Sequence, residues 1–197
     1  LPPELFFIIV QQLNDRCFAW LVLRNVSTAI RQATECAFAS YFKKDCHIRF
    51  SGPFAARILA DHWQLNNYSQ GSWIHKHKEP LQNQFPSFLF KASGFHPAHS
   101  RASAVLKMQD ESADYTNDSN LLAVRRFRSS STLFFAAFRQ PSDVQASISR
   151  ESHFVRLDGK LKSFVIPSIT VDVVGQHILF DWRYLYQMFY LDELRLR

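Results

Sequence analysis

The chain has 197 residues, which suits one mid-sized domain or a small module followed by a larger one. It contains 19 phenylalanines and only 5 glycines, so it can form a large aromatic core but offers few glycine-built phosphate loops. The net charge of +6 permits an acidic partner or nucleic acid without requiring either, and no apolar run is long enough to span a membrane.

The first segment predicts a helix that is apolar nearly all round. Pro2 and Pro3 precede Glu4, and proline is tolerated in the first turn of a helix, where an acidic residue is also favoured. Leu5–Val10 and Leu13 then place apolar side chains on almost every side. Such a helix has to be covered nearly all round.

Two further short helices follow within residues 1–42. Asn14 and Asp15 break the first helix and can cap a second one over Cys17–Leu23, which is again apolar on every side. Ser27 or Thr28 can cap a third, amphipathic helix. Its apolar positions are Ile30, Ala33, Ala37, Phe38 and Tyr41, and its polar positions are Arg31, Gln32 and Glu35. A unit this small cannot bury two apolar helices internally, so the excess surface meets either the rest of the chain or another protein.

Two spaced patterns in these helices carry a family resemblance. The pattern Leu-Pro-x-Glu-Leu, three residues, Ile, three residues, Leu is found at Leu1, Pro2, Glu4, Leu5, Ile9 and Leu13. The pattern Leu-Arg-x-Val-Ser, then an apolar residue and Arg, is found at Leu23, Arg24, Val26, Ser27, Ile30 and Arg31. Together they resemble the F-box family, in the style of fungal members. The chain departs from the family in a longer link between Leu13 and Val26, in lacking an acidic-Leu pair before the second helix, and in lacking the terminal tryptophan, whose place Phe38 or Phe42 can take.

The resemblance implies a three-helix F-box over residues 1–42 that binds a Skp-type adaptor and, through it, a cullin. It places Leu1, Pro2, Leu5, Ile9 and Leu13 in or beside that interface, while Val26 and Ile30 support the fold or contact the partner. The chain would then be a non-catalytic adaptor that recruits an unknown protein target to an SCF ubiquitin ligase, without cofactor or metal. The alternatives are a structural or regulatory protein that binds the Skp-type adaptor outside a ligase, a basic nucleic-acid-binding protein, and, last, an enzyme.

From residue 43 onward the pattern changes to short β-prone runs separated by polar or proline-bearing stretches. Ile169, Val171 and Val173 alternate with polar residues, as in a strand with one buried face, and Gly175-Gln176 predicts a hairpin. Asp181 can cap a final helix whose apolar stripe is Trp182, Leu185, Tyr186 and Phe189. The expected strands are His47–Phe50, Ser72–His75, Ser87–Lys91, Ala104–Met108, Leu121–Phe127, Thr132–Phe138, His153–Leu157, Phe164–Val174 and Ile178–Phe180. The fold class is therefore α+β: the three-helix F-box, then a mainly antiparallel β domain over residues 43–197 with a C-terminal helix.

The remaining features predict no chemistry. Residues 64–71 and the acidic residues 109–120 predict exposed loops, and the basic run at 125–128 predicts a solvated strand face more than a nucleic-acid surface. The histidine pairs 75/77 and 96/99 lack a third ligand, and no repeat indicates the target class. Three cysteines without metal-ligand spacing, Cys17, Cys36 and Cys46, predict reduced, buried thiols and a cytoplasmic or nuclear protein. The chain begins without methionine, as a piece cut from a longer protein would.

Overall fold

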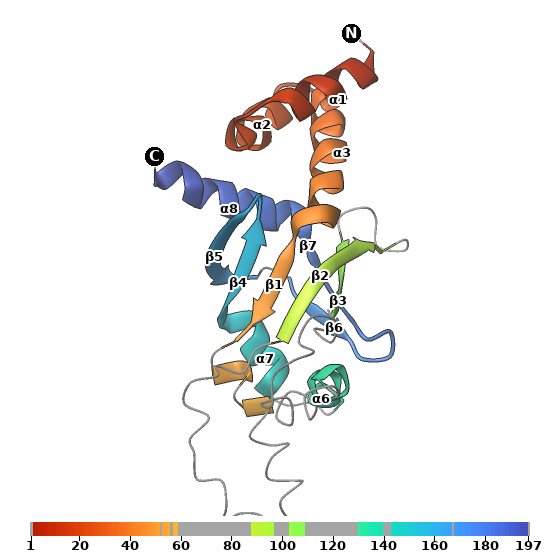
Figure 1. Cartoon of the computed structure of the whole chain (residues 1–197), viewed down its shortest axis with the longest axis vertical. Coiled ribbons are helices and arrows are strands. Elements are labelled where there is room, and N and C mark those ends of the chain that lie inside the picture. Colours follow the sequence, from red (N-terminus) through yellow and green to blue (C-terminus); the bar gives the residue numbers. More distant parts are fainter. Residues whose placement is uncertain are drawn as a thin grey trace, which may run out of the picture.

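The computed structural model describes residues 2–51, 53–55, 57–58, 88–96, 103–108, 130–139, 143–166 and 168–196. Three helices come first, α1 (Pro3–Gln12), α2 (Arg16–Leu21) and α3 (Thr28–Asp45), with a short 3-10 helix at Leu23–Asn25 before α3. They lie together at one end of the molecule, the upper end in Figure 1. The predicted division between residues 42 and 43 falls inside α3, which leads into the first strand with only Cys46 between them.

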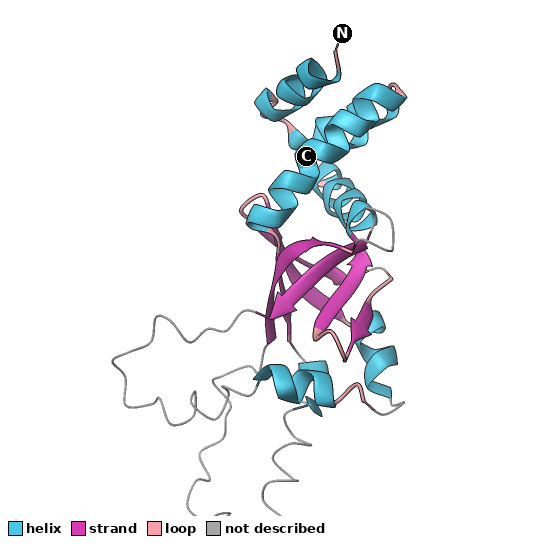
Figure 2. Ribbon diagram, turned by 90° about the vertical axis from the view of Figure 1, so that its right-hand side faces the viewer, coloured by secondary structure: helices cyan, strands magenta, loops and turns pink. Residues whose placement is uncertain are grey.

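A curved antiparallel sheet of seven strands, in the form of a half-barrel, occupies the middle of the molecule (Figure 2). Its strand order is β5-β4-β1-β2-β3-β7-β6, and each neighbouring pair is antiparallel. The bounds are β1 (His47–Phe50), β2 (Phe88–Phe95), β3 (Ser103–Met108), β4 (Ser152–Leu157), β5 (Lys160–Val165), β6 (Thr170–Asp172) and β7 (His177–Asp181). Two short helices, α6 (Ser130–Ala136) and α7 (Asp143–Arg150), lie at the lower end in Figure 1, and α8 (Trp182–Arg195) closes the chain. The expected α+β class is confirmed.

Three helices begin at the caps that the sequence predicts. The Asp15 carboxylate accepts a hydrogen bond from the Phe18 N–H at 3.0 Å, and the Ser27 hydroxyl accepts one from Ile30 at 3.3 Å. The Asp181 carboxylate accepts hydrogen bonds from the N–H groups of residues 183 and 184, the second and third residues of α8. Each cap satisfies backbone donors that the helix cannot satisfy itself, and a cap of this kind is worth about 1 kcal/mol.

The core is one continuous cluster made mainly of aromatic side chains. It fills the inner face of the sheet and joins the helices at both ends, so the N-terminal helices share it with the strands. Toward the N-terminal helices it contains Trp20, Phe38, Phe42, Phe95, Trp182, Tyr186 and Tyr190. Toward α6 it contains Phe50, Phe54, Phe88, Phe90, Phe134, Phe135 and Phe138.

Residues 132–138, expected to form a strand, belong largely to α6. Phe134 and Phe135 are adjacent and both are buried, at 0% and 2% exposure. Successive side chains of a strand point to opposite faces of its sheet, so a strand would expose one of the two unless both faces were covered. A helix instead directs neighbouring positions and the one a turn later toward the same side, and Phe138 also packs against the core. The strand prediction was wrong because β-propensity outweighed this spacing.

The expected single strand over Phe164–Val174 is two strands. Its first residues end β5, which pairs with β4, and its later residues form β6, which pairs with β7 at the other edge of the sheet. Between the two, Pro167 has no N–H to donate to a strand ladder, and Ser168 has a φ of 51°. The inward direction of Ile169, Val171 and Val173 and the predicted hairpin before β7 are both confirmed.

The cysteines are only partly as expected. Cys17 and Cys46 are buried and form no disulfide with a described residue, and burial raises the pKa of Cys46 well above its ordinary value. Cys36 is exposed, because it lies four residues after Gln32 on the polar side of α3. The expected strands Ser72–His75 and Leu121–Phe127, the loops 64–71 and 109–120, and the basic run 125–128 lie outside the described residues. No helix in the described ranges is both long enough and apolar enough to cross a membrane.

Candidate partner-binding surface

Large apolar side chains lie exposed on the N-terminal helices. Of the fourteen large hydrophobic residues that are exposed in the described part of the chain, six fall between residues 5 and 26. They are Leu5, Ile8, Ile9, Phe18, Val22 and Val26. Single exposed hydrophobics are ordinary, but a set of this size on one small unit is typical of an interaction site.

Helix α1 divides its apolar side chains between the core and solvent. Val10 is buried at 3% exposure, and Phe7 packs against the core. Leu5 and Ile9 lie one helical turn apart, so they form one ridge, and they are 43% and 47% exposed. The chain therefore attaches α1 by one side and leaves the Leu5/Ile9 ridge about half exposed.

The seven residues predicted to serve the partner interface do not all have the same environment. Pro2, Leu5, Ile9 and Val26 are exposed, Val26 at 62%. Ile30 is half-buried near the start of α3, and Leu13 is half-buried and packs against the core. Leu1 lies outside the described residues. The structure thus leaves four of the predicted residues available to a partner and assigns Leu13 at least partly to the fold.

Helix α2 packs its buried face on α8. Trp20 is fully buried, with its ring centroid 4.9 Å from that of Phe38, 5.6 Å from that of Trp182 and 5.1 Å from that of Tyr186. The Arg24 guanidinium stacks over the Trp20 ring at 4.7 Å. These contacts join α2, α3 and α8 into one aromatic cluster, so the N-terminal helices are not tethered to the sheet by a linker alone.

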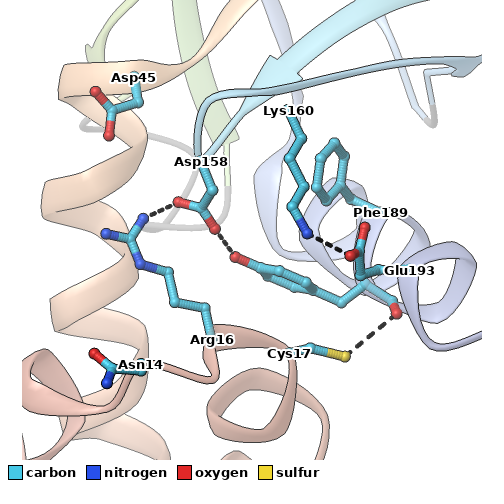
Figure 3. A pocket seen from close by; sticks show the side chains of 9 residues that line it. Asn14, Arg16, Cys17, Asp45, Asp158, Lys160, Phe189 and Glu193 are labelled. Carbon is cyan, nitrogen blue, oxygen red and sulfur yellow. Dashed lines mark hydrogen bonds and ion pairs between the residues drawn. The ribbon is translucent and has the colours of Figure 1, made fainter. Parts of the chain in front are cut away.

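A polar cluster beside this packing ties α2 to the sheet as well (Figure 3). The Arg16 guanidinium donates a hydrogen bond to one carboxylate oxygen of Asp158, and the Tyr190 hydroxyl donates to the other. Arg16 also stacks on the Tyr41 ring at 4.2 Å, and the Cys17 thiol donates to the Tyr190 carbonyl at 3.6 Å. Asp158 therefore connects α2 with α8 from its position in the β4–β5 turn.

Arg16 and Tyr190 keep the protonated states in which they donate to Asp158. Burial lowers the pKa of Arg16, but the neighbouring Asp158 carboxylate outweighs it and the net shift is upward. Burial and the same carboxylate raise the pKa of the Tyr190 phenol, so it stays protonated and keeps donating. Arg16 therefore stays charged and Tyr190 stays a donor over the ordinary pH range, and both hold the β4–β5 turn through Asp158.

An open pocket with a volume of 290 Å³ lies over this cluster. Its charged groups are largely paired with one another: Arg16 with Asp158, and Lys160 with Glu193. Hydrogen bonds from Lys160 first, and then from Lys162, hold the pKa of Glu193 below its ordinary value. The lining residues are Asn14, Arg16, Cys17, Asp45, Asp158, Lys160, Phe189, Tyr190 and Glu193. Within the described ranges, no three His, Cys, Asp or Glu side chains come together as metal ligands.

A second bridge holds α3 to α8. The Glu35 carboxylate forms an ion pair with Arg24 of the 3-10 helix at 2.9 Å and with Arg183 of α8 at 2.8 Å. Together with the Asp158 cluster, this bridge holds α2 and α3 to α8 and to the β4–β5 turn, and α1, which carries the exposed ridge, packs on α3. A partner bound to that ridge would therefore be held in a defined orientation to the sheet.

Sequence reasoning missed the importance of Asp158, although the sequence contains a signal for it. Asp158 and Gly159 form a two-residue turn with φ of 51° and 72°, and Leu157 pairs with Lys160 across it. Asp-Gly is a strong hairpin signal because both residues tolerate positive φ. The same dipeptide would have predicted β5 at residues 160–165. Comparisons with protein-family models, with curated proteins and with solved structures find no match.

Proposed function

We propose that the chain is an F-box adaptor whose N-terminal helices bind a Skp-type subunit and whose remainder recruits a protein target to an SCF ubiquitin ligase. One observation carries the proposal: Leu5 and Ile9, two of the residues that carry the F-box resemblance, form an exposed ridge on a helix that packs against the core through Phe7 and Val10. A ridge of this kind suits an anchor in a partner's apolar groove.

The ridge could instead have packed against the rest of the chain, but the described residues do not bury it. Val10 faces the core from the same helix, so the α1 backbone is already positioned with Leu5 and Ile9 pointing away from it. Full burial of an aliphatic side chain of this size is worth about 1.5–3 kcal/mol, part of which offsets the cost of association. Two such side chains, with Val26 and Phe18 nearby in the chain, can supply a small set of hot spots.

The test is the double variant Leu5→Ala with Ile9→Ala, assayed for binding to a purified Skp-type subunit by calorimetry. We expect binding to weaken by at least about a hundredfold, because truncating a hot-spot residue costs about 2 kcal/mol or more. The thermal melt followed by circular dichroism should stay within a few degrees of the parent chain, since the truncated side chains are half-exposed already.

The matched control is Leu161→Ala with Val165→Ala. These aliphatic residues are exposed on β5, outside the motif, at 65% and 43%. The control should bind the Skp-type subunit as the parent chain does. Unchanged binding by a folded Leu5/Ile9 variant would refute the proposal, whereas a Skp-type complex that never captures a cullin would favour a structural or regulatory role outside a ligase.

A further inference from the structure

The outer face of the sheet has a row of basic residues that crosses four strands. His47 on β1 pairs with Lys91 on β2 and with Arg156 on β4, and Lys91 pairs in turn with Lys107 on β3. Arg156, His47, Lys91 and Lys107 thus lie side by side in neighbouring strands, and we call them the basic row.

The basic row points away from the core. Along each strand, the residue next to the row is buried on the inner face: Val155, Ile48, Phe90 and Leu106 are all at 0% exposure. Because side chains alternate between the two faces of a strand, the row belongs to the opposite face. Arg156, Lys91 and Lys107 are exposed, and His47 is half-buried.

The basic row places like charges at neighbouring positions, which lowers the stability of the sheet. Directly paired residues in an antiparallel sheet have Cα atoms about 4.5–5.5 Å apart, and like charges at such positions destabilise the sheet. Lys91 and Lys107 occupy such a pair, and within the described ranges no ion pair involves Lys91, Lys107 or Arg156. Six other basic residues of the described ranges form ion pairs with acids, namely Arg16, Arg24, Arg57, Lys160, Lys162 and Arg183, whereas Arg31, Lys43, Lys44, Arg49, Arg139, Arg150 and Arg195 form none there either. The row differs from these residues because the strand register places its members side by side on one face of the sheet.

Apolar side chains lie beside the row on the same face. Leu161 pairs with Arg156 across β5 and β4 and is 65% exposed. Phe154 pairs with Arg49, a further exposed basic residue, which lies two residues after His47 on β1. Among the aromatic residues described on β1 to β4, only Phe154 is exposed. Nucleic-acid surfaces combine basic residues with several aromatics that stack on bases, so the mixture here suits an acidic protein segment with apolar side chains better.

We propose that the basic row binds an acidic, partly apolar segment of another protein. The inference deepens the proposed function and rests on it in one respect, that the segment belongs to the recruited target. The row and the Leu5/Ile9 ridge lie on different elements, the sheet and α1, and these are fixed to one another through α3, α8 and the Asp158 cluster. Adaptor and target would thus be bound on separate surfaces of one rigid body.

The experiment measures fluorescence anisotropy of a labelled peptide of alternating Glu and Leu residues titrated with the full chain. Lys91→Glu with Lys107→Glu should weaken binding by about tenfold or more at low ionic strength, because two attractions become repulsions. Added salt should weaken binding to the parent chain and change the variant little. The neutral pair Lys91→Gln with Lys107→Gln provides a milder version in case the reversal disturbs folding.

The matched control is Arg150→Glu with Arg195→Glu, which changes the net charge equally at exposed positions off the sheet. It should bind the peptide as the parent does. An equal loss in the control, or no binding by the parent, would overturn the proposal. So would tighter, row-dependent binding of an oligothymidylate, which would make the row a nucleic-acid surface. Binding seen only after Asp110, Glu111, Asp114 and Asp118 are changed to amides would show that the chain itself supplies the acidic segment, and would also overturn it.

The same variants separate this inference from the proposed function. Skp-type binding should survive the Lys91/Lys107 change, and peptide binding should survive the Leu5/Ile9 change. A parent chain that binds the acidic peptide but no Skp-type subunit would contradict the adaptor assignment while leaving the basic row as an acidic-peptide site. As an independent readout, Lys91→Glu alone should raise the melting temperature, because it replaces a cross-strand repulsion with an attraction.

Discussion

The inner face of the sheet and the N-terminal helices are both strongly apolar in sequence, but the first is buried and part of the second is exposed. At the inner face of the sheet, Phe50 and Phe90 are buried completely, in contact with each other and with Phe134 of α6. On the N-terminal helices, Leu5, Ile9 and Val26 remain outside. The difference lies in the cover: helices α6 and α3 lie over the sheet, whereas no described element lies over the ridge of α1. Apolar sequence thus becomes core where the chain supplies a second layer, and exposed surface where it does not.

Helix α2 repeats this contrast within a single turn. Trp20 is fully buried, while Phe18, two residues earlier, is 43% exposed. The two aromatic residues therefore offer a direct comparison between a side chain that holds the fold together and one that is free for a partner.

Replacing these two side chains should give the largest effects. Trp20→Ala removes a fully buried indole from the α2–α3–α8 cluster and should lower the free energy of unfolding by about 3–5 kcal/mol, enough to unfold much of a marginally stable chain. Phe18→Ala should cost less than about 1 kcal/mol, since much of its ring is already in water. Urea denaturation followed by circular dichroism measures both. Equal costs for the two variants would mean that α2 is not divided into a core side and a free side.

Weakening the Asp158 cluster, which holds the N-terminal helices to the sheet, should have an intermediate effect on the free energy of unfolding. Asp158→Asn keeps a residue that tolerates positive φ, but removes the charge that Arg16 faces and weakens the hydrogen bond from Tyr190. We expect a loss of about 1–3 kcal/mol in unfolding free energy, with faster hydrogen exchange in α2 than in β1 and β4.

Lys160→Met provides the comparison for the Asp158 cluster. Lys160 pairs with Glu193 nearby, but its side chain is 55% exposed against 12% for Asp158. An exposed pair contributes about 0–1 kcal/mol, so this variant should stay close to the parent chain. If Asp158→Asn were no more damaging than Lys160→Met, the Asp158 cluster would not be what fixes the helices to the sheet.

Much of this arrangement could be predicted from local chemistry. The caps at Asp15, Ser27 and Asp181 were predictable because a short polar side chain at a helix start has few other roles. The alternation at Ile169, Val171 and Val173 was predictable because a one-sided sheet imposes it. The excess apolar surface of residues 1–42 could be stated from sequence, but its division into buried Val10 and exposed Ile9 could not, because the docking of α1 on α3 sets it.

Features that depend on long-range pairing escaped prediction. The basic row exists only because the register brings His47, Lys91 and Lys107 together from segments far apart in the chain. The same holds for Arg16 and Asp158, which are separated by 142 positions. Propensity misled at Phe134 and Phe135, where phenylalanine favours strands but the adjacent pair needs a helix to bury both rings.

Acid should destabilise the sheet core more than the N-terminal helices, and this effect should be smaller than those above. His153 lies inside the sheet core, where its Nε2 is 2.9 Å from the Ile148 carbonyl and its ring packs on Phe50 and Phe54. Residues 2–45 contain no histidine at all. Burial lowers the pKa of His153 below its ordinary value of 6.5, although the Ile148 carbonyl and Glu151 act in the other direction.

The sign follows from which state binds the proton. Below an ordinary pKa of 6.5 the unfolded chain takes up a proton at His153 that the folded chain resists, so unfolding becomes more favourable as the pH falls. The carboxylates of Asp172 and Glu193, whose pKa values are lowered from 3.8 and 4.5, lose their stabilising effect only at lower pH. We therefore expect the urea midpoint to fall between about pH 7.5 and about pH 5.5, and His153→Gln, which cannot titrate, to flatten that fall. Hydrogen exchange over the same range should show β4 losing protection before α1 and α3, and an unchanged pH dependence in His153→Gln would move the titrating group elsewhere.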